Sequence, residues 1–200
     1  VFPDAIAAVL ARHGGSIEPG DIFIANDPYG SGGSHLPDVY IMRPIFVDGA
    51  IEGFSGVTAH QADIGGIVPG SNSTGSTEIY QEGLRIPTLK LYERGVPNET
   101  IFAIIEHNVR VPKTVLGDIR AQISATIVGE REFRRLAVRY GVMTLREYTD
   151  AILDYSERMA RADIRDLPDG TYRFTDYIDG DSIESGTVVI RVAVTVSGDR

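Results

Sequence analysis

The dipeptide Asp48-Gly49 lies between two β-rich runs and strongly constrains how the first quarter of the chain can fold. Asp-Gly suits the positive φ angles of a type I′ turn, which predicts a β-hairpin with a two-residue loop. The numbers of paired residues then sum to 97, so Asp38 would lie opposite Ala59 and His60 opposite Pro37. The segments that flank the hairpin are therefore predicted to be neighbours.

These flanking segments hold two of the chain's four histidines, His35 and His60, together with Asp38. Side chains of opposed or diagonal residues lie roughly 4.5–8 Å apart in an antiparallel pair, which is within reach of a shared cation. Two imidazoles and one carboxylate suit a divalent metal such as zinc or manganese, or iron, in an open site. The alternative is that the two histidines are hydrogen-bonded residues at strand ends, without a metal.

Two further carboxylates, Asp27 and Asp63, are the candidate catalytic residues. Each could be a fourth ligand, an acceptor that orients an imidazole, or a general base. The alternative for Asp27 is a turn residue before Pro28, and the alternative for Asp63 is a cap on the glycine-rich loop that follows it.

Composition excludes several classes of function. A formal net charge of −9 gives no basic face for nucleic acid or an anionic membrane, and no apolar run approaches a membrane span of about 18–20 residues. The absence of cysteine leaves only nitrogen and oxygen ligands for a metal. No phosphate-binding loop with a Gly-Lys-Ser or Gly-Lys-Thr sequence is present, so we expect no ATP site on this segment. These features indicate a cytoplasmic protein.

The pattern of the whole chain predicts an α+β fold. Residues 1–97 read as a β-hairpin and loop-rich metal-site region, residues 98–167 as a helical region with an antiparallel helix pair, and residues 168–200 as a β region. Val188–Val196 alternates as a strong strand face, which needs partners. We therefore expect residues 1–200 to be a single excerpt of a longer protein, with its β region continued elsewhere.

The segment 78–87 packs charged and aromatic residues closely together. It is predicted either to line a pocket or to end a helix at Gly83 with Arg85 in a salt bridge.

Several short sequence motifs, taken in order and spacing, resemble those of the hydantoinase B family. They are Asn26-Asp27-Pro28-Tyr29, Gly33-Ser34-His35-Leu36-Pro37-Asp38, Ala59-His60, Asp63-Ile64-Gly65-Gly66, Pro69-Gly70-Ser71, the segment 78–87, Leu116-Gly117-Asp118, Arg120-Ala121-Gln122 and Leu167-Pro168-Asp169-Gly170-Thr171-Tyr172. The family includes subunits of N-methylhydantoinase, 5-oxoprolinase, caprolactamase and acetone carboxylase.

The resemblance implies ATP-dependent chemistry shared between two subunits of a hetero-oligomer. A hydantoinase A-type partner would hold ATP and magnesium and phosphorylate a small-molecule substrate, and the B-type subunit would complete the reaction at a divalent metal. The substrate would be a cyclic amide such as hydantoin, N-methylhydantoin or 5-oxoproline, or, as the alternative, a ketone such as acetone or acetophenone that is carboxylated. A structural or assembly domain with a non-catalytic metal is the third alternative. The isolated fragment is expected to be inactive.

In metal-bearing members of the family, the ligand positions match His35, Asp38 and His60. Many members have a second histidine directly after the one that matches His60, whereas this chain has Gln61. Glutamine can donate or accept a hydrogen bond but cannot act as an acid or base, so we expect a different environment for the ligands here.

Overall fold

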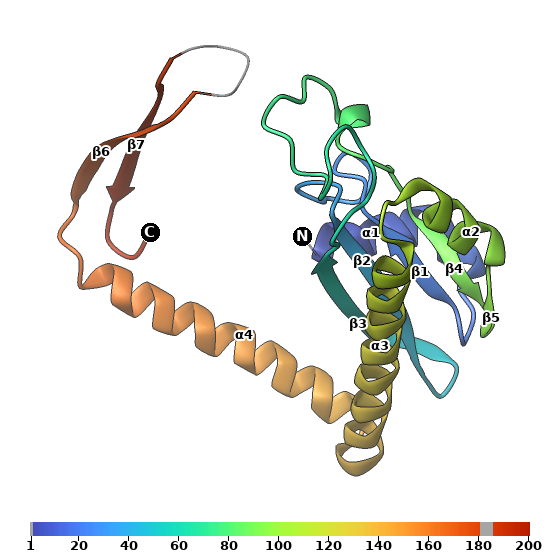
Figure 1. Ribbon diagram of the computed structural model, residues 1–200. Coiled ribbons are helices and arrows are strands. Elements are labelled where there is room, and N and C mark those ends of the chain that lie inside the picture. Colours follow the sequence, from blue (N-terminus) through green and yellow to red (C-terminus); the bar gives the residue numbers. More distant parts are fainter. Residues whose placement is uncertain (1, 181–185) are drawn as a thin grey trace. The chain divides into compact units, whose positions relative to one another are not determined.

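The computed structural model describes residues 2–180 and 186–200, which form two compact units (Figure 1). Unit 1 ends at Arg139 and unit 2 begins at Tyr140. The predicted α+β class is confirmed, with strands in the first part, long helices in the middle and a β-hairpin near the end. The boundary between the units falls inside the predicted helical region, near the end of its longest helix.

Unit 1 is built around a five-stranded antiparallel sheet of strand order β3-β2-β1-β4-β5. Its central strand is β1, a four-residue strand whose residues are all buried. The strands are β1 (Ile22–Ala25), β2 (Asp38–Val47), β3 (Ala50–His60), β4 (Leu89–Glu93) and β5 (Val96–Pro97). Strands β2 and β3 form the predicted hairpin. They extend beyond the three β2 residues, 40–42, that pair with β1.

The hairpin turn has the predicted conformation, but the predicted register holds only beside the turn. Asp48 and Gly49 have φ angles of 50° and 84°, as a type I′ turn requires. Two pairs next to the turn follow the predicted register, and the register then shifts by one because β3 has an extra residue, Glu52, between the partners of neighbouring β2 residues. The prediction that Asp38 pairs with Ala59 was therefore wrong, and Asp38 lies directly opposite His60.

Helices cover both faces of the sheet in unit 1 (Figure 1). Alternate residues of β1 point to opposite faces. Ile22 and Ile24 pack with α2 (Glu99–Asn108) and α3 (Pro112–Tyr140), while Phe23 and Ala25 pack with α1 (Phe2–His13). The central strand is therefore buried on both sides. Short 3₁₀ turns lie at Gly14–Ser16 and Ile79–Gln81.

The starts of α2 and α3 are where the sequence predicts them. The Asn98 side chain accepts a hydrogen bond from the backbone N–H of Ile101, which caps α2, and Pro112 is the first residue of α3. In the described residues, every helix is either too short or too polar to span a lipid bilayer.

The buried stripe of α3 differs from the predicted one at its far end. The sequence predicts Val115, Ile119, Ile123 and Ile127 on one face, but Ile127 is 46% exposed and Thr126 is fully buried. Each step of four residues turns an α-helix about 40° past the starting face, so three such steps rotate Ile127 by about 120° away from Val115. A step of eleven residues returns to the same face, and that position is Thr126.

Unit 2 contains α4 (Val142–Arg165) and a hairpin of β6 (Gly170–Ile178) and β7 (Val188–Val196). One face of the hairpin is apolar because Tyr172 pairs with Val194 and Phe174 with Val192. These side chains are exposed in the structure. The antiparallel pairing of the two long helices stays a prediction, because α3 and α4 belong to different units.

The core position Ile119 and the exposed position Ile127 offer a matched test of the packing of α3. Ile119→Ala should lower the free energy of unfolding by about 2–5 kcal/mol, because Ile119 is fully buried under the sheet. Ile127→Ala, the same change on the same helix, should cost less than about 1 kcal/mol. Urea unfolding followed by circular dichroism measures both, and equal losses would contradict the assigned stripe.

Candidate metal centre

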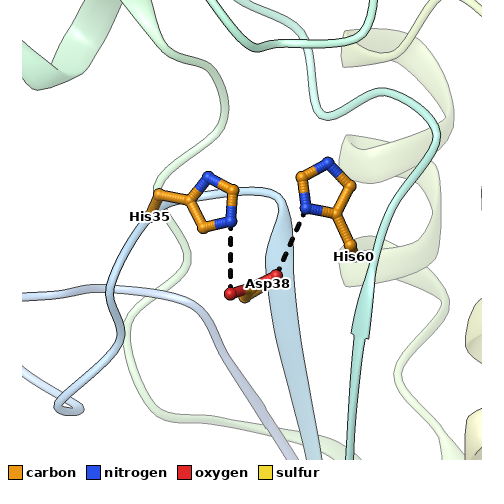
Figure 2. A group of neighbouring side chains, drawn as sticks. All are labelled: His35, Asp38 and His60. Carbon is orange, nitrogen blue, oxygen red and sulfur yellow. Dashed lines mark ion pairs between the residues drawn. The ribbon is translucent and has the colours of Figure 1, made fainter. Parts of the chain in front are cut away.

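The predicted ligands come together at the end of the hairpin that is remote from its turn (Figure 2). Asp38 is the first residue of β2 and His60 is the last residue of β3, so their side chains lie on the same face as a directly opposed pair. His35 lies in the loop before β2, and the backbone N–H of Asp38 donates to its carbonyl oxygen. That turn directs the imidazole of His35 toward the Asp38 carboxylate.

The carboxylate of Asp38 lies between the two imidazoles. His35 Nε2 is 3.2 Å from Asp38 Oδ2, and His60 Nδ1 is 3.4 Å from Asp38 Oδ1. The ring centroids of the two histidines are 4.9 Å apart, and the Ser34 hydroxyl donates to Asp38 Oδ2 at 3.2 Å. The side chains are 35%, 27% and 50% exposed for His35, Asp38 and His60, so the cluster is open to an incoming molecule.

The donor set fits a divalent cation. One ligand atom from each of the three residues lies within 4.8 Å of the other two. A cation with bonds of about 2.0–2.2 Å to nitrogen and oxygen holds opposite ligand atoms at most about 4.4 Å apart. Small side-chain rotations would therefore bring His35, Asp38 and His60 into bonding positions. Neither Asp27 nor Asp63 is part of this cluster.

A buried pair of amides lies behind the cluster. Gln61 is fully buried, and its Nε2 donates to Gln122 Oε1 on α3 at 2.9 Å, while Gln122 Nε2 donates to the Val39 carbonyl at 2.9 Å. The Val39 carbonyl can only accept, so this chain fixes the orientation of both amides. Gln61 and Gln122 therefore tie the ends of β2 and β3, directly beside Asp38 and His60, to α3. Gln61 Oε1 is buried and has no hydrogen-bond partner among the residues that the structure describes.

The side chain of Asn26 holds the loop that carries His35. Asn26 is fully buried, and its Nδ2 donates both to the Leu36 carbonyl at 2.8 Å and to the Leu84 carbonyl at 2.9 Å. Its Oδ1 accepts from the Ile86 N–H at 2.6 Å. One amide thereby joins the end of β1, the loop of the candidate metal centre and the segment 84–86.

Asp63 lies in a dense set of hydrogen bonds. Its Oδ2 accepts from the backbone N–H groups of Gly65 and Arg110, and its Oδ1 accepts from Gly70 N–H and from the Arg110 guanidinium at 2.8 Å. Burial raises the pKa of Asp63, but the hydrogen bonds from Arg110, Gly70 and Gly65 outweigh it and hold the pKa below its ordinary value. All four acceptor positions of the carboxylate are used.

Asp27 is held in the same way by a different arginine. Arg85 Nε donates to Asp27 Oδ1 at 2.8 Å and Arg85 Nη2 donates to Asp27 Oδ2 at 3.0 Å, and the backbone N–H groups of Tyr29 and Gly30 also bond the carboxylate. The hydrogen bond from Arg85 is the largest influence, and together with the others it holds the pKa of Asp27 below its ordinary value. The salt bridge predicted for Arg85 is present.

The sequence interpretation gave no role to Gln122, Asn26 or Arg110. A signal for Gln122 existed, because it is a polar residue inside the apolar stripe of α3 between Ile119 and Ile123. No local pattern predicts the contacts of Asn26 or Arg110, whose partners are up to 60 residues away.

The fold and the cluster define an α+β protein with an open His/Asp site at a strand end. The chain belongs to the Hydantoinase B/oxoprolinase family, whose model matches residues 1–200.

Two Pseudomonas proteins are among its relatives. A protein of Pseudomonas sp. strain NS671, named as the B-type subunit of a D-/L-hydantoinase, is 36% identical over 197 residues, which cover 97% of this chain and 33% of that protein. The crystal structure of the ATP-dependent caprolactamase of Pseudomonas jessenii matches with a TM-score of 0.89 at 35% identity, over 98% of this chain and 34% of that one. This chain spans about a third of the length of these relatives.

The nucleotide-free structure of acetone carboxylase has the same fold, with a TM-score of 0.86 at 20% identity over 98% of this chain and 28% of that one.

The ion pair of Asp63 should make the stability of the chain depend on acid pH. The pKa of Asp63 in the folded chain is below its unfolded value of about 3.9. The ion pair therefore contributes fully to the free energy of unfolding above about pH 3.9, and this contribution is lost as the pH falls through the folded pKa. Asp63→Asn should lower the free energy of unfolding by about 2 kcal/mol at pH 7 and flatten its fall below about pH 4. Urea unfolding at pH values from 7 to 2.5 measures this.

Asp118, an exposed carboxylate on α3, provides the control. Asp118→Asn should leave both the stability at pH 7 and the slope in acid unchanged within about 0.5 kcal/mol. An Asp63→Asn variant with wild-type stability and slope would contradict the role assigned to the ion pair.

Proposed function

We propose that this chain is part of the B-type subunit of an ATP-dependent amidohydrolase that opens a cyclic amide such as hydantoin, N-methylhydantoin or 5-oxoproline. The observation that carries the proposal is the convergence of His35, Asp38 and His60 in a chain of the Hydantoinase B/oxoprolinase family. The ATP-dependent caprolactamase of Pseudomonas jessenii, which has the same fold at 35% identity, supports cyclic-amide chemistry.

In this proposal His35, Asp38 and His60 hold a divalent metal, either zinc or manganese, or iron. When bound, such a metal polarises a carbonyl oxygen or lowers the pKa of a water molecule. The chain's own contribution is to present two imidazoles and one carboxylate together at the end of the β2–β3 hairpin and in the loop before it. The exposure of all three side chains leaves room for a substrate.

Catalytic roles for Asp63 and Asp27 stay predictions, and the hydrogen bonds favour a positioning role for each. A general base needs a free acceptor position directed at the substrate. Both carboxylates have all four positions filled, and both have a lowered pKa, which makes them weak bases. We propose that Asp63 shapes the loop after β3, and that Asp27 orients Arg85.

The ATP and magnesium would be held by a hydantoinase A-type partner, in a hetero-oligomer. One relative is named as a B-type hydantoinase subunit and another as the beta subunit of a caprolactamase, and both names support an assembly of unlike subunits.

Removal of one imidazole tests the metal centre. His60→Ala should weaken metal binding by about a hundredfold or more and abolish turnover, while the fold and the assembly with the partner remain, because His60 is half exposed. Metal analysis of the purified complex and circular dichroism measure the two effects.

The matched control is His107→Ala, since the imidazole of His107 is exposed on α2 and hydrogen-bonds the Ala103 carbonyl. This variant should keep metal and turnover. A His60→Ala complex that retains metal and activity would refute the proposed centre, and one that fails to fold or assemble would favour a structural or assembly role.

The second candidate function is the carboxylation of a ketone, such as acetone or acetophenone, by an alpha-type subunit of an ATP-dependent carboxylase. The observation that favours it is the shared fold with acetone carboxylase.

A product assay on the complete complex with its partner separates the two reactions. We expect ATP-dependent ring opening of hydantoin or 5-oxoproline and no fixation of labelled bicarbonate into acetone. The reverse result would replace the hydrolase proposal with the carboxylase. Turnover by residues 1–200 alone would contradict the two-subunit proposal.

A further inference from the structure

A pocket of about 630 Å³ lies in unit 1, where four segments of the sequence meet. The segments are the start of the loop after β1, the glycine-rich loop after β3, the segment 80–87 and the end of α2, and they contribute Asp27, Gly66, Tyr80, Arg85 and Asn108 to the wall. A volume of this size can hold a small organic molecule. The pocket is lined by residues outside the His/Asp cluster.

Arg85 is held in a fixed orientation in this wall. The edge formed by its Nε and Nη2 donates two hydrogen bonds to the carboxylate of Asp27, which is 8% exposed. The guanidinium carbon lies 5.3 Å from the centre of the Tyr29 ring, which is a cation–π contact. A charged side chain that is fixed on two sides loses little freedom when it binds a ligand.

The other edge of the guanidinium is available. A guanidinium presents five N–H donors, and those of Nη1 together with the second N–H of Nη2 have no hydrogen-bond partner among residues 2–180 and 186–200. This edge has the spacing that carboxylate and phosphate oxygens accept in pairs.

Several acceptors of the wall near Arg85 are already used. The Asp27 carboxylate has four donors, the Leu84 carbonyl accepts from Asn26, and the Gly66 carbonyl accepts from Arg110. The negative charge of Asp27 is therefore compensated, and the unused N–H groups of Arg85 are charged donors that the wall offers to a ligand. Such a wall complements a ligand group that is rich in acceptors.

We propose that this pocket is an oxyanion-binding site in which the Nη1–Nη2 edge of Arg85 binds a carboxylate or phosphate group of a small molecule. Asp27 acts as a positioning residue that holds the guanidinium. The site does not depend on the metal, and Asn26 fixes its distance from the candidate metal centre, because its Nδ2 bonds the carbonyls of both Leu36 and Leu84.

Titration of the isotopically labelled protein with inorganic phosphate and, separately, with acetate tests the site by nuclear magnetic resonance. With EDTA present, at least one anion should bind saturably and shift the backbone amide signals of Gly65, Gly66 and Gly83, which line the pocket. Arg85→Gln should weaken the binding at least about tenfold, since two charge-assisted hydrogen bonds are lost.

Arg85→Lys keeps the charge beside Asp27 but lacks the planar edge, so it should lose most of the affinity even if Arg85→Gln does not fold. The control is Arg120→Gln, an exposed arginine on α3, which should bind as the wild type does. Binding of acetate alone assigns a carboxylate ligand, and binding of phosphate alone assigns a phosphorylated one.

Three results would overturn the proposal: no saturable binding of either anion, wild-type affinity in both Arg85 variants, or an equal loss in Arg120→Gln. Because EDTA removes any metal, none of them bears on the function proposed for His35, Asp38 and His60. Likewise, loss of metal in His60→Ala leaves the anion titration unchanged.

Discussion

The fully buried amide of Asn26 is the interaction on which the arrangement of both sites depends. Its nitrogen bonds the Leu36 and Leu84 carbonyls, and its oxygen accepts from Ile86, so three segments that are distant in sequence meet at one side chain. An aspartate could not replace it without loss because it lacks the two N–H donors, and a glutamine would add a methylene at a fully buried position. The candidate metal loop and the arginine pocket therefore form one rigid framework, although separate residues carry their chemistry.

Much of the fold follows from local patterns, and the differences have specific physical causes. The Asp48-Gly49 turn, the cap at Asn98 and the start of α3 at Pro112 depend on the conformations of single residues, so the sequence predicts them well. The register of the hairpin depends on an extra residue inside β3, which no local signal marks. The stripe of α3 was extended by steps of four, which exceed the helical turn of 3.6 residues, so the error grew with distance along the helix.

In the candidate site, too, the sequence predicts what depends on a local pattern and misses what depends on the tertiary fold. His35, Asp38 and His60 could be grouped because a predicted hairpin brings their segments together, and the structure places their ligand atoms within 4.8 Å of one another. The partners of Asp63 and Asp27 could not be found in the same way. They are arginines 47 and 58 residues further along the chain, and only the tertiary fold brings them into contact.

The bulge at the extra residue Glu52 decides which face of the sheet His60 points to. Side chains alternate between the two faces of a strand, so without the bulge His60 would point to the face opposite to Asp38. With it, both point the same way. The site therefore depends on the bulge as well as on the residue types, and comparison of related chains should ask whether a change in the number of residues between the turn and this histidine is matched by the gain or loss of a bulge.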